Sequence, residues 1–131
     1  VRVEKITAVH DTGTVINPQQ ATGQVEGGLA QGVGYSVYED FKIEKGLPKT
    51  RNFTTYIIPT ALDVPEYNVK FVECKESHGP VGAKSLGEPP IIPIGAAIAN
   101  AVYHATGVRV KELPISAEVM WKAMQDSQKS K

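Results

Sequence analysis

Glycines crowd a segment that begins as a well-signalled helix, at positions 23, 27, 28, 32 and 34. Asn17 suits the N-cap, Pro18 suits the first helical position, and Gln20 can reach back as in a capping box. These signals predict a helix from Asn17 toward about Tyr38. Each glycine inside it costs up to about 1 kcal/mol relative to alanine. The composition therefore indicates that another segment lies close against the backbone of this helix.

Strand-like and helix-like segments follow one another along the rest of the chain. β-Branched and alternating residues predict strands, while proline, serine and glycine at segment ends predict helix boundaries. The order of the elements indicates an α+β fold, with helices packed on a mixed or mainly antiparallel sheet. We expect strands at Val1–His10, Glu39–Glu44, Thr50–Ile58, Tyr67–Cys74 and Val108–Lys111, a helix from about Pro93 that ends at Gly107, and a last helix from Ser116 to about Gln125.

The length and composition are those of one globular domain. The 131 residues are 41% hydrophobic and carry a formal net charge of +0, so no basic excess points to nucleic acid. No segment approaches the roughly 18 apolar residues of a membrane-spanning helix. We assign residues 1–125 to one subdomain and residues 126–131 to a polar tail that frays.

The single cysteine and the first residue give two further expectations. Cys74 cannot form a disulfide within the chain, which favours a reducing, cytoplasmic compartment. The chain begins at Val1, directly in a strand-like segment, and not at methionine. We therefore expect a fragment or a processed subunit that belongs to a larger assembly.

The loop before the second predicted helix contains the strongest catalytic candidate, Glu88. Pro89 restricts Glu88 to an extended conformation, and Pro90 stiffens the segment further. Gly82 and Gly87 let the main chain approach a ligand. A carboxylate held rigidly in a partly desolvated place can serve as a general base. The residues alone leave an alternative open, because a glutamate just before a helix also opposes the helix dipole, worth about 0.3–1 kcal/mol.

Three blocks of short motifs follow one another along the chain. The first comprises Asp11–Gly13, Ile16–Pro18, Gly23–Gly28 and Gln31-Gly32, the second Tyr56–Ala61 and Asp63–Pro65, and the third Lys84–Pro90. They resemble, in the same order, motifs of the molybdenum hydroxylases, the family of xanthine dehydrogenase and aldehyde oxidase. The first block is similar to the family's Asp-x-Gly, Ile-Asn-Pro and Gly-Gln-(Ile/Val)-Glu-Gly-Gly motifs, and the third to its Gly-Glu-Pro-Pro motif. The resemblance extends from about residue 9 to about residue 120.

The resemblance implies a role for each residue that matches a motif. Glu88 would be the active-site base beside molybdenum, and would take a proton from a hydroxyl or water on the metal. In this family sulfurs of molybdopterin hold the metal, so the resemblance implies no metal ligand among the side chains of this chain. Gln24 would hydrogen-bond the pterin. The loop residues that would line the pterin and the metal are Lys84, Ser85, Leu86 and Gly87.

The resemblance also implies what the chain lacks. It would be the C-terminal part of a molybdopterin-binding subunit. That subunit would bind molybdopterin either in its simple form or as a dinucleotide. Iron–sulfur clusters and FAD would lie on partner domains or subunits, so the chain alone would be inactive. The substrate would be a small molecule, either a purine, an N-heterocycle or an aldehyde, with a purine favoured. The alternative is a non-catalytic homologue or assembly module that retains only the fold.

Overall fold

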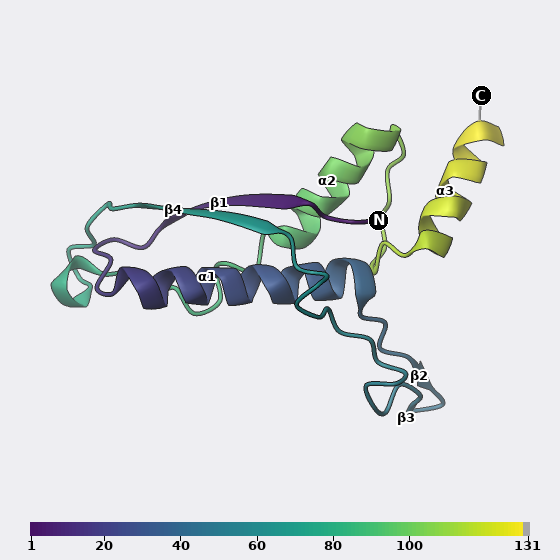
Figure 1. Cartoon of the computed structure of the whole chain (residues 1–131), viewed down its shortest axis with the longest axis horizontal. Coiled ribbons are helices and arrows are strands. Elements are labelled where there is room, and N and C mark those ends of the chain that lie inside the picture. The colour runs from purple at the N-terminus through teal and green to yellow at the C-terminus, as the bar shows by residue number, and fades with distance from the viewer. Residues whose placement is uncertain (130–131) are drawn as a thin grey trace.

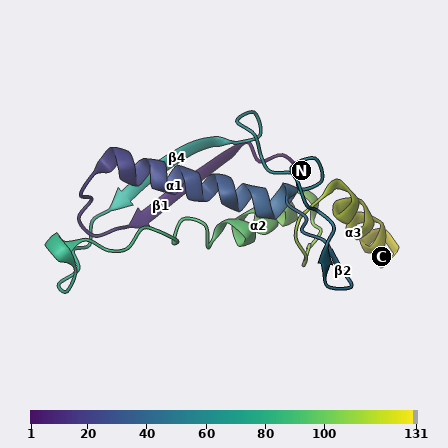
Figure 2. The same ribbon diagram turned by 90° about the horizontal axis from the view of Figure 1, so that it is seen from below.

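A computed structural model describes residues 1–129, and a long helix packed on two parallel strands forms its centre (Figure 1). The strands are β1 (Lys5–Asp11) and β4 (Glu66–Val72), and the helix is α1 (Pro18–Val33). β1 and β4 pair along all seven residues of each strand. α1 covers one face of this pair (Figure 2). Because the strands are parallel, the chain must cross back from the end of β1, and α1 forms the first part of that crossover.

α1 begins as the sequence predicts. The Asn17 side chain accepts a hydrogen bond of 3.0 Å from the Gln20 backbone N–H, and Pro18 is the first helical residue. After its last α-helical residue the chain winds into a π-helix, η1 (Gly34–Tyr38). The predicted extent of the helix is therefore confirmed, with a change of winding in its last turn.

Two further helices follow β4. α2 (Ile94–Thr106) ends where predicted, with Gly107 in the left-handed conformation at φ +71°. α3 (Ala117–Lys129) follows Ser116, whose hydroxyl caps its first turn. α3 continues four residues past its predicted end, and residues 130–131 of the predicted tail lie outside the described residues. Within residues 1–129, no helix has the length and apolar character needed to cross a membrane.

The two predicted strands in the middle of the chain are wrong in extent. A short antiparallel hairpin of β2 (Ile43–Glu44) and β3 (Leu47–Pro48) stands in place of strands at Glu39–Glu44 and Thr50–Ile58. At Asn52 the chain turns, because its side chain and carbonyl oxygen accept nearby backbone N–H groups at 2.8–3.1 Å. Local hydrogen bonds of this kind compete with strand pairing, and the β-branched composition of the segment does not reveal them.

The last predicted strand, Val108–Lys111, is also wrong. In the described chain it is irregular, and Val108 and Val110 pack into the core without pairing with another strand. The parallel pair β1–β4 and the antiparallel pair β2–β3 are separate two-stranded sheets. The α+β class is therefore confirmed at the level of helices combined with small sheets.

The hydrophobic core lies between α1, α2 and the β1–β4 pair. Buried side chains spaced about one turn apart form a stripe on each helix, as expected of amphipathic helices. Ala8 is the buried residue of β1, and Ile115 and Met120 extend the core toward α3. The two helical stripes are Val25, Leu29 and Val33 on α1, and Ile94, Ile98 and Val102 on α2.

Beside its buried stripe, α1 presents glycines to the chain that leads into α2. A Cβ atom at Gly28 would lie 2.7 Å from Pro90 Cβ, and one at Gly32 would lie 2.6 Å from Ile94 Cβ. Real Cβ atoms do not approach this closely, so the two segments can touch only because both positions are glycine. The close contact that the glycine-rich composition predicts is confirmed at these two positions.

Replacing Gly32 with alanine is expected to destabilise the fold by about 1–3 kcal/mol, the usual cost of overpacking a core. The added methyl group would overlap the base of the Ile94 side chain, which cannot swing away. Gly27→Ala is the matched control on the same helix, since no described atom outside its own helical turn lies within 4 Å of the position. Alanine there should stabilise the chain by up to about 1 kcal/mol. Denaturant unfolding measures both changes, and equal effects would contradict the contact.

Candidate functional site

A pocket of about 370 Å³ opens where the turn after β1, the first turns of α1 and the loop before α2 meet. Four of the six residues selected from the sequence line it. Ser85 and Glu88 are exposed and are not part of the lining. The structure therefore brings the glutamine of α1 and the glycine-rich loop together. The four lining residues are Gln24, Lys84, Leu86 and Gly87.

Backbone hydrogen bonds attach the loop to the turn after β1. The Lys84 N–H donates to the Thr12 carbonyl oxygen at 2.8 Å, and the Thr14 N–H donates to the Gly82 carbonyl oxygen at 2.9 Å. Gly13 lies between these bonds at φ +60°, where a Cβ atom would lie 2.2 Å from the Gly82 oxygen. Only glycine fits this crossing, so the glycine of the predicted turn is also the point where the loop is attached.

An ion pair reinforces this attachment. Lys84 Nζ lies 2.5 Å from Asp11 Oδ2. Asp11 Oδ1 accepts backbone N–H groups from Gly13 at 3.0 Å and from Cys74 at 3.3 Å. The hydrogen bond from Lys84, followed by that from Gly13, lowers the pKa of Asp11, and the same contact with Asp11 raises the pKa of Lys84. Both side chains are roughly one-third exposed, so solvent screens part of the attraction.

Before α2, the chain crosses α1 in a short segment, residues 87–90, which we call the strap. The Gln24 side-chain amide donates to the Gly87 carbonyl oxygen at 2.8 Å. Pro90 is less than 2% exposed and lies against Gly28. Gln24 and Gly28 are four residues apart and so share one face of α1. The strap is therefore held at both ends.

Glu88 lies between these two contacts. Its carbonyl oxygen accepts the Ile91 N–H at 3.1 Å, in the turn that leads to α2. α2 starts six residues after Glu88 and has no acidic residue in its first turn, so the helix-dipole explanation for Glu88 is wrong. The Glu88 residue is exposed. The partial desolvation predicted for it is therefore not supplied by residues 1–129.

Two hydroxyl groups in the pocket were not selected from the sequence. Thr12 is 4% exposed and Thr14 is half-buried, and within residues 1–129 neither Oγ1 atom has a hydrogen-bond partner. A buried polar group left without a partner costs about 1–3 kcal/mol. Both oxygens are closed off from solvent, so a ligand in the pocket would bond them only if the surrounding atoms shifted. Their only signal in the sequence is that they flank Gly13 in the first motif block.

The lining of the pocket combines amides, hydroxyls and apolar side chains. Gln20 and Gln24 stand near Ile16 and Leu86 around the two threonines. Such a mixture suits a small organic ligand that needs both hydrogen bonds and apolar contact. Among residues 1–129, no group of three or more His, Cys, Asp or Glu side chains could hold a metal ion.

Comparison with known proteins identifies relatives of the chain. Residues 1–65 match a family described as the molybdopterin cofactor-binding domain. The chain is 42% identical to the xanthine dehydrogenase molybdenum-binding subunit of Escherichia coli O157:H7, over 92% of this chain and 16% of the relative. It is 37% identical to the 6-hydroxypseudooxynicotine dehydrogenase complex subunit gamma of Paenarthrobacter nicotinovorans, over 98% of this chain and 17% of that subunit.

The fold also has a counterpart among solved structures. Quinoline 2-oxidoreductase from Pseudomonas putida 86 superposes with a TM-score of 0.89 and 34% identity, over 95% of this chain and 16% of that one. The chain thus spans about a sixth of the length of the proteins it matches. Motifs, family match, relatives and fold agree, and the chain belongs to the molybdenum hydroxylases, the family of xanthine dehydrogenase and aldehyde oxidase, as a segment of the molybdenum-binding subunit.

Proposed function

We propose that this chain carries the catalytic base and part of the cofactor pocket of a molybdopterin-dependent hydroxylase. The observation that carries the proposal is the strap, in which Glu88 is held between the contacts to Gln24 and Gly28, next to the pocket. A carboxylate mounted on a fixed backbone needs little reorganisation to meet a reacting proton. Glu88 would take up that proton as a general base. The rest of the subunit would exclude water from around it.

The pocket residues fit molybdopterin by the chemistry of their side chains. When bound, molybdopterin supplies a molybdenum centre that accepts two electrons and is held by the cofactor's own sulfurs. One N–H of the Gln24 amide donates to Gly87, which leaves its oxygen and its second N–H for the pterin. The hydroxyls of Thr12 and Thr14, which have no partner among residues 1–129, would bond the same ligand only after the atoms that enclose them shifted. The cofactor would be present as such or as a dinucleotide.

The loop residues would contribute in different ways. Leu86 and Gly87 would line the pterin directly, since both already line the pocket. Ser85 is exposed and would reach the cofactor only in the complete subunit. The Lys84 ammonium pairs with Asp11, so Lys84 would line the pocket with its backbone and stem and hold the loop with its charge.

The substrate would be a small molecule with an electron-poor carbon. The relatives are named for xanthine, for 6-hydroxypseudooxynicotine and for quinoline, which are all nitrogen-containing compounds. Another relative is named as an aldehyde oxidoreductase subunit. We favour a purine, because the identity of 42% to the xanthine dehydrogenase subunit exceeds the 37% and 34% to the other two proteins.

The chain would work inside a larger assembly. It would form the C-terminal part of the molybdenum-binding subunit, next to iron–sulfur and FAD subunits, and one relative is itself named as subunit gamma of a complex. Nucleic acid is not proposed as a partner, because the formal net charge is +0. A membrane is not proposed as a partner, because no segment approaches the roughly 18 apolar residues of a membrane-spanning helix. A cytoplasmic location rests on the single cysteine, Cys74.

Within that subunit, residues 1–125 would be a cofactor-binding subdomain and residues 126–131 its tail. Each strand of the β1–β4 pair has an outer edge that pairs with no other strand of residues 1–129. In the complete subunit these edges would pair with further strands, and β1 and β4 would become part of a mixed or mainly antiparallel sheet.

Glu88→Gln in the complete enzyme is expected to lower kcat by about 10²- to 10⁴-fold, the usual contribution of a general base, with molybdenum content unchanged. Glutamine keeps the shape of the side chain but cannot take up a proton. Glu4→Gln is the matched control, because Glu4 is exposed and lies outside the pocket lining. Unchanged turnover of Glu88→Gln would remove the base assignment. A purified wild-type complex without molybdenum would instead favour the non-catalytic assembly module.

Asp11→Asn and Lys84→Met are expected to speed hydrogen exchange of the loop by similar amounts. The double variant should exchange no faster than either single variant. The reason is that each change removes the same ion pair. Hydrogen exchange of residues 79–88 and molybdenum content measure the effect, and Lys84→Arg should retain most of the wild-type behaviour. If only Lys84→Met lost molybdenum, the ammonium would contact the cofactor and not Asp11 alone.

The same ion pair predicts how the loop responds to pH. The pKa of Asp11 is lowered, so its contribution is complete above the ordinary value of about 3.9 and is lost as the pH falls through the lowered value. The pKa of Lys84 is raised, so its contribution is complete below about 10.4 and is lost as the pH rises through the raised value. The difference in unfolding temperature between the wild type and Asp11→Asn, measured across the pH range, isolates the contribution of the ion pair. A difference that stays constant into acid would contradict it.

A further inference from the structure

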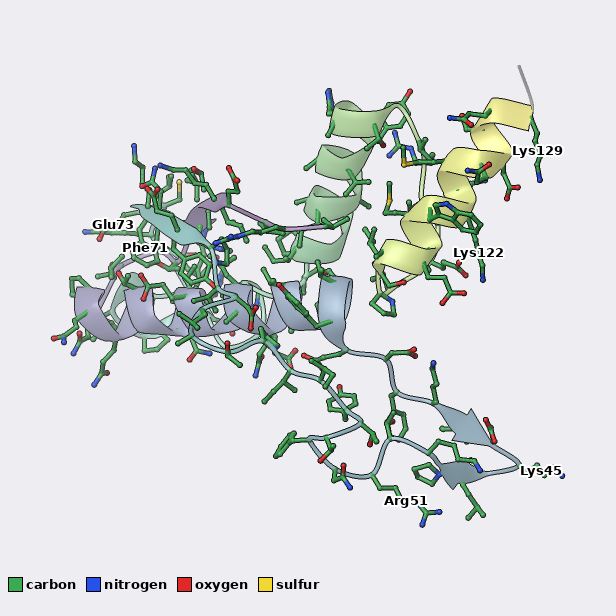
Figure 3. The ribbon with its side chains drawn as sticks, turned by 45° about the vertical axis from the view of Figure 1, so that its right-hand side comes forward. Lys45, Arg51, Phe71, Glu73, Lys122 and Lys129 are labelled. Carbon is green, nitrogen blue, oxygen red and sulfur yellow. The ribbon has the colours of Figure 1, made fainter. Side chains whose placement is uncertain are left out.

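Residues 40–62, which we call the arm, project from the body of the molecule and include the β2–β3 hairpin (Figure 3). Of these 23 residues, all of them described, none is buried. Seven of the 18 large apolar side chains that are exposed in the described chain belong to the arm. Phe53 and Leu62 are 75% and 89% exposed. The arm therefore carries apolar surface that the rest of this chain does not cover.

The arm nevertheless has a defined shape. The Glu39 backbone N–H donates to the Gly34 carbonyl oxygen at 2.9 Å where the arm leaves η1. The Glu39 carboxylate accepts a hydrogen bond from the Tyr56 hydroxyl, on the half of the arm that returns to the body. The rings of Phe41 and Tyr56 meet edge to face, with centroids 6.2 Å apart. These contacts tie the outgoing and returning halves together and leave the apolar side chains on the outside.

Charge and shape describe the partner that would fit. A hollow of about 400 Å³ on the arm is lined by three aromatic rings together with Arg51. Two ion pairs within the arm, at 3.0 and 3.1 Å, neutralise its acidic residues, Asp40 and Glu44. Lys45 at the hairpin tip and Arg51, both labelled in Figure 3, have no ion-pair partner among residues 1–129. The arm therefore suits an apolar surface bordered by acidic groups.

We propose that the arm docks on the remainder of the molybdenum-binding subunit, on an apolar surface with acidic groups opposite Lys45 and Arg51. The inference rests on the proposed function, in which this chain is a segment of that subunit. The chain spans 16% of its relatives, so most of the subunit lies outside it. A second copy of the arm fits less well, because its acidic residues, Asp40 and Glu44, are already ion-paired and offer no free carboxylate to Lys45 and Arg51.

The solved relative supports a partner within the same chain. Its superposition covers 95% of this chain, and the omitted 5% amounts to about seven residues, fewer than the 23 of the arm. Most of the arm therefore lies within the superposed part of a chain about six times as long. Interfaces that are permanent in this way are the more apolar ones, as the exposed side chains of the arm require.

Hydrogen–deuterium exchange of the complete subunit tests the proposal. Peptides covering residues 50–62 should exchange about tenfold or more slowly in the wild-type subunit than in the Phe53→Asp subunit, because the arm's own hydrogen bonds are common to both and only docking differs. Phe53→Asp should abolish this protection and leave that of β1 and β4 unchanged. Thr54→Ser is the matched control on the same arm, since Thr54 is exposed, does not line the hollow and contributes only its backbone N–H to the turn at Asn52.

Two outcomes would overturn the proposal. Exchange of the arm as fast in the wild-type subunit as in the Phe53→Asp subunit would mean that nothing covers it. Protection that appears only when other subunits are added, or that depends on subunit concentration, would place the partner on another subunit or a second copy. Molybdenum content is measured on the same samples. A protected arm in a subunit without molybdenum would leave this inference standing while the proposed function fails, and an unprotected arm in a molybdenum-loaded subunit would do the reverse.

Discussion

The contact between α1 and the chain that enters α2 is the constraint on which the rest of the structure depends. α1 gives one stripe of side chains to the core and the neighbouring stripe, through Gly28 and Gly32, to Pro90 and Ile94. The glycines cost up to about 1 kcal/mol each in helix propensity. Burial of the Pro90 and Ile94 side chains offsets this, at about 25 cal/mol per Å² of apolar surface removed from water.

The same contact sets the geometry of the site. A side chain at Gly28 would push Pro90 outward, and the 2.8 Å hydrogen bond from Gln24 to the strap would then be out of reach. At the other end of the loop, the close approach of Gly13 to the Gly82 carbonyl oxygen fixes where the loop crosses the turn after β1. The loop between these fixed points is short, so Glu88 has little freedom of position. Rigidity at Glu88 is therefore a consequence of packing around glycine and proline and does not require a partner for its carboxylate.

The predictable part of this protein is the part governed by local rules. Asn17, Pro18 and Gly107 mark helix ends through backbone chemistry that acts within a few residues, and the structure confirms them. The strand at Thr50–Ile58 fails because Asn52 offers the backbone a competing turn. The ion pair of Asp11 with Lys84 joins residues 73 positions apart. Without the strand register nothing in the sequence brings those two residues together, and the unpartnered hydroxyls of Thr12 and Thr14 depend on the same register.

Several features share one property: each is incomplete in this chain. Glu88 is exposed, Thr12 and Thr14 lack hydrogen-bond partners among the described residues, and the arm is uncovered. Bulk water screens the charge of an exposed carboxylate, and a buried hydroxyl without a hydrogen-bond partner costs free energy. Under the proposed function, further protein would exclude water from Glu88 and cover the arm. Under the proposed function, the chain would supply the position of the base, and the surrounding subunit would supply the low-dielectric environment in which that position becomes catalytic.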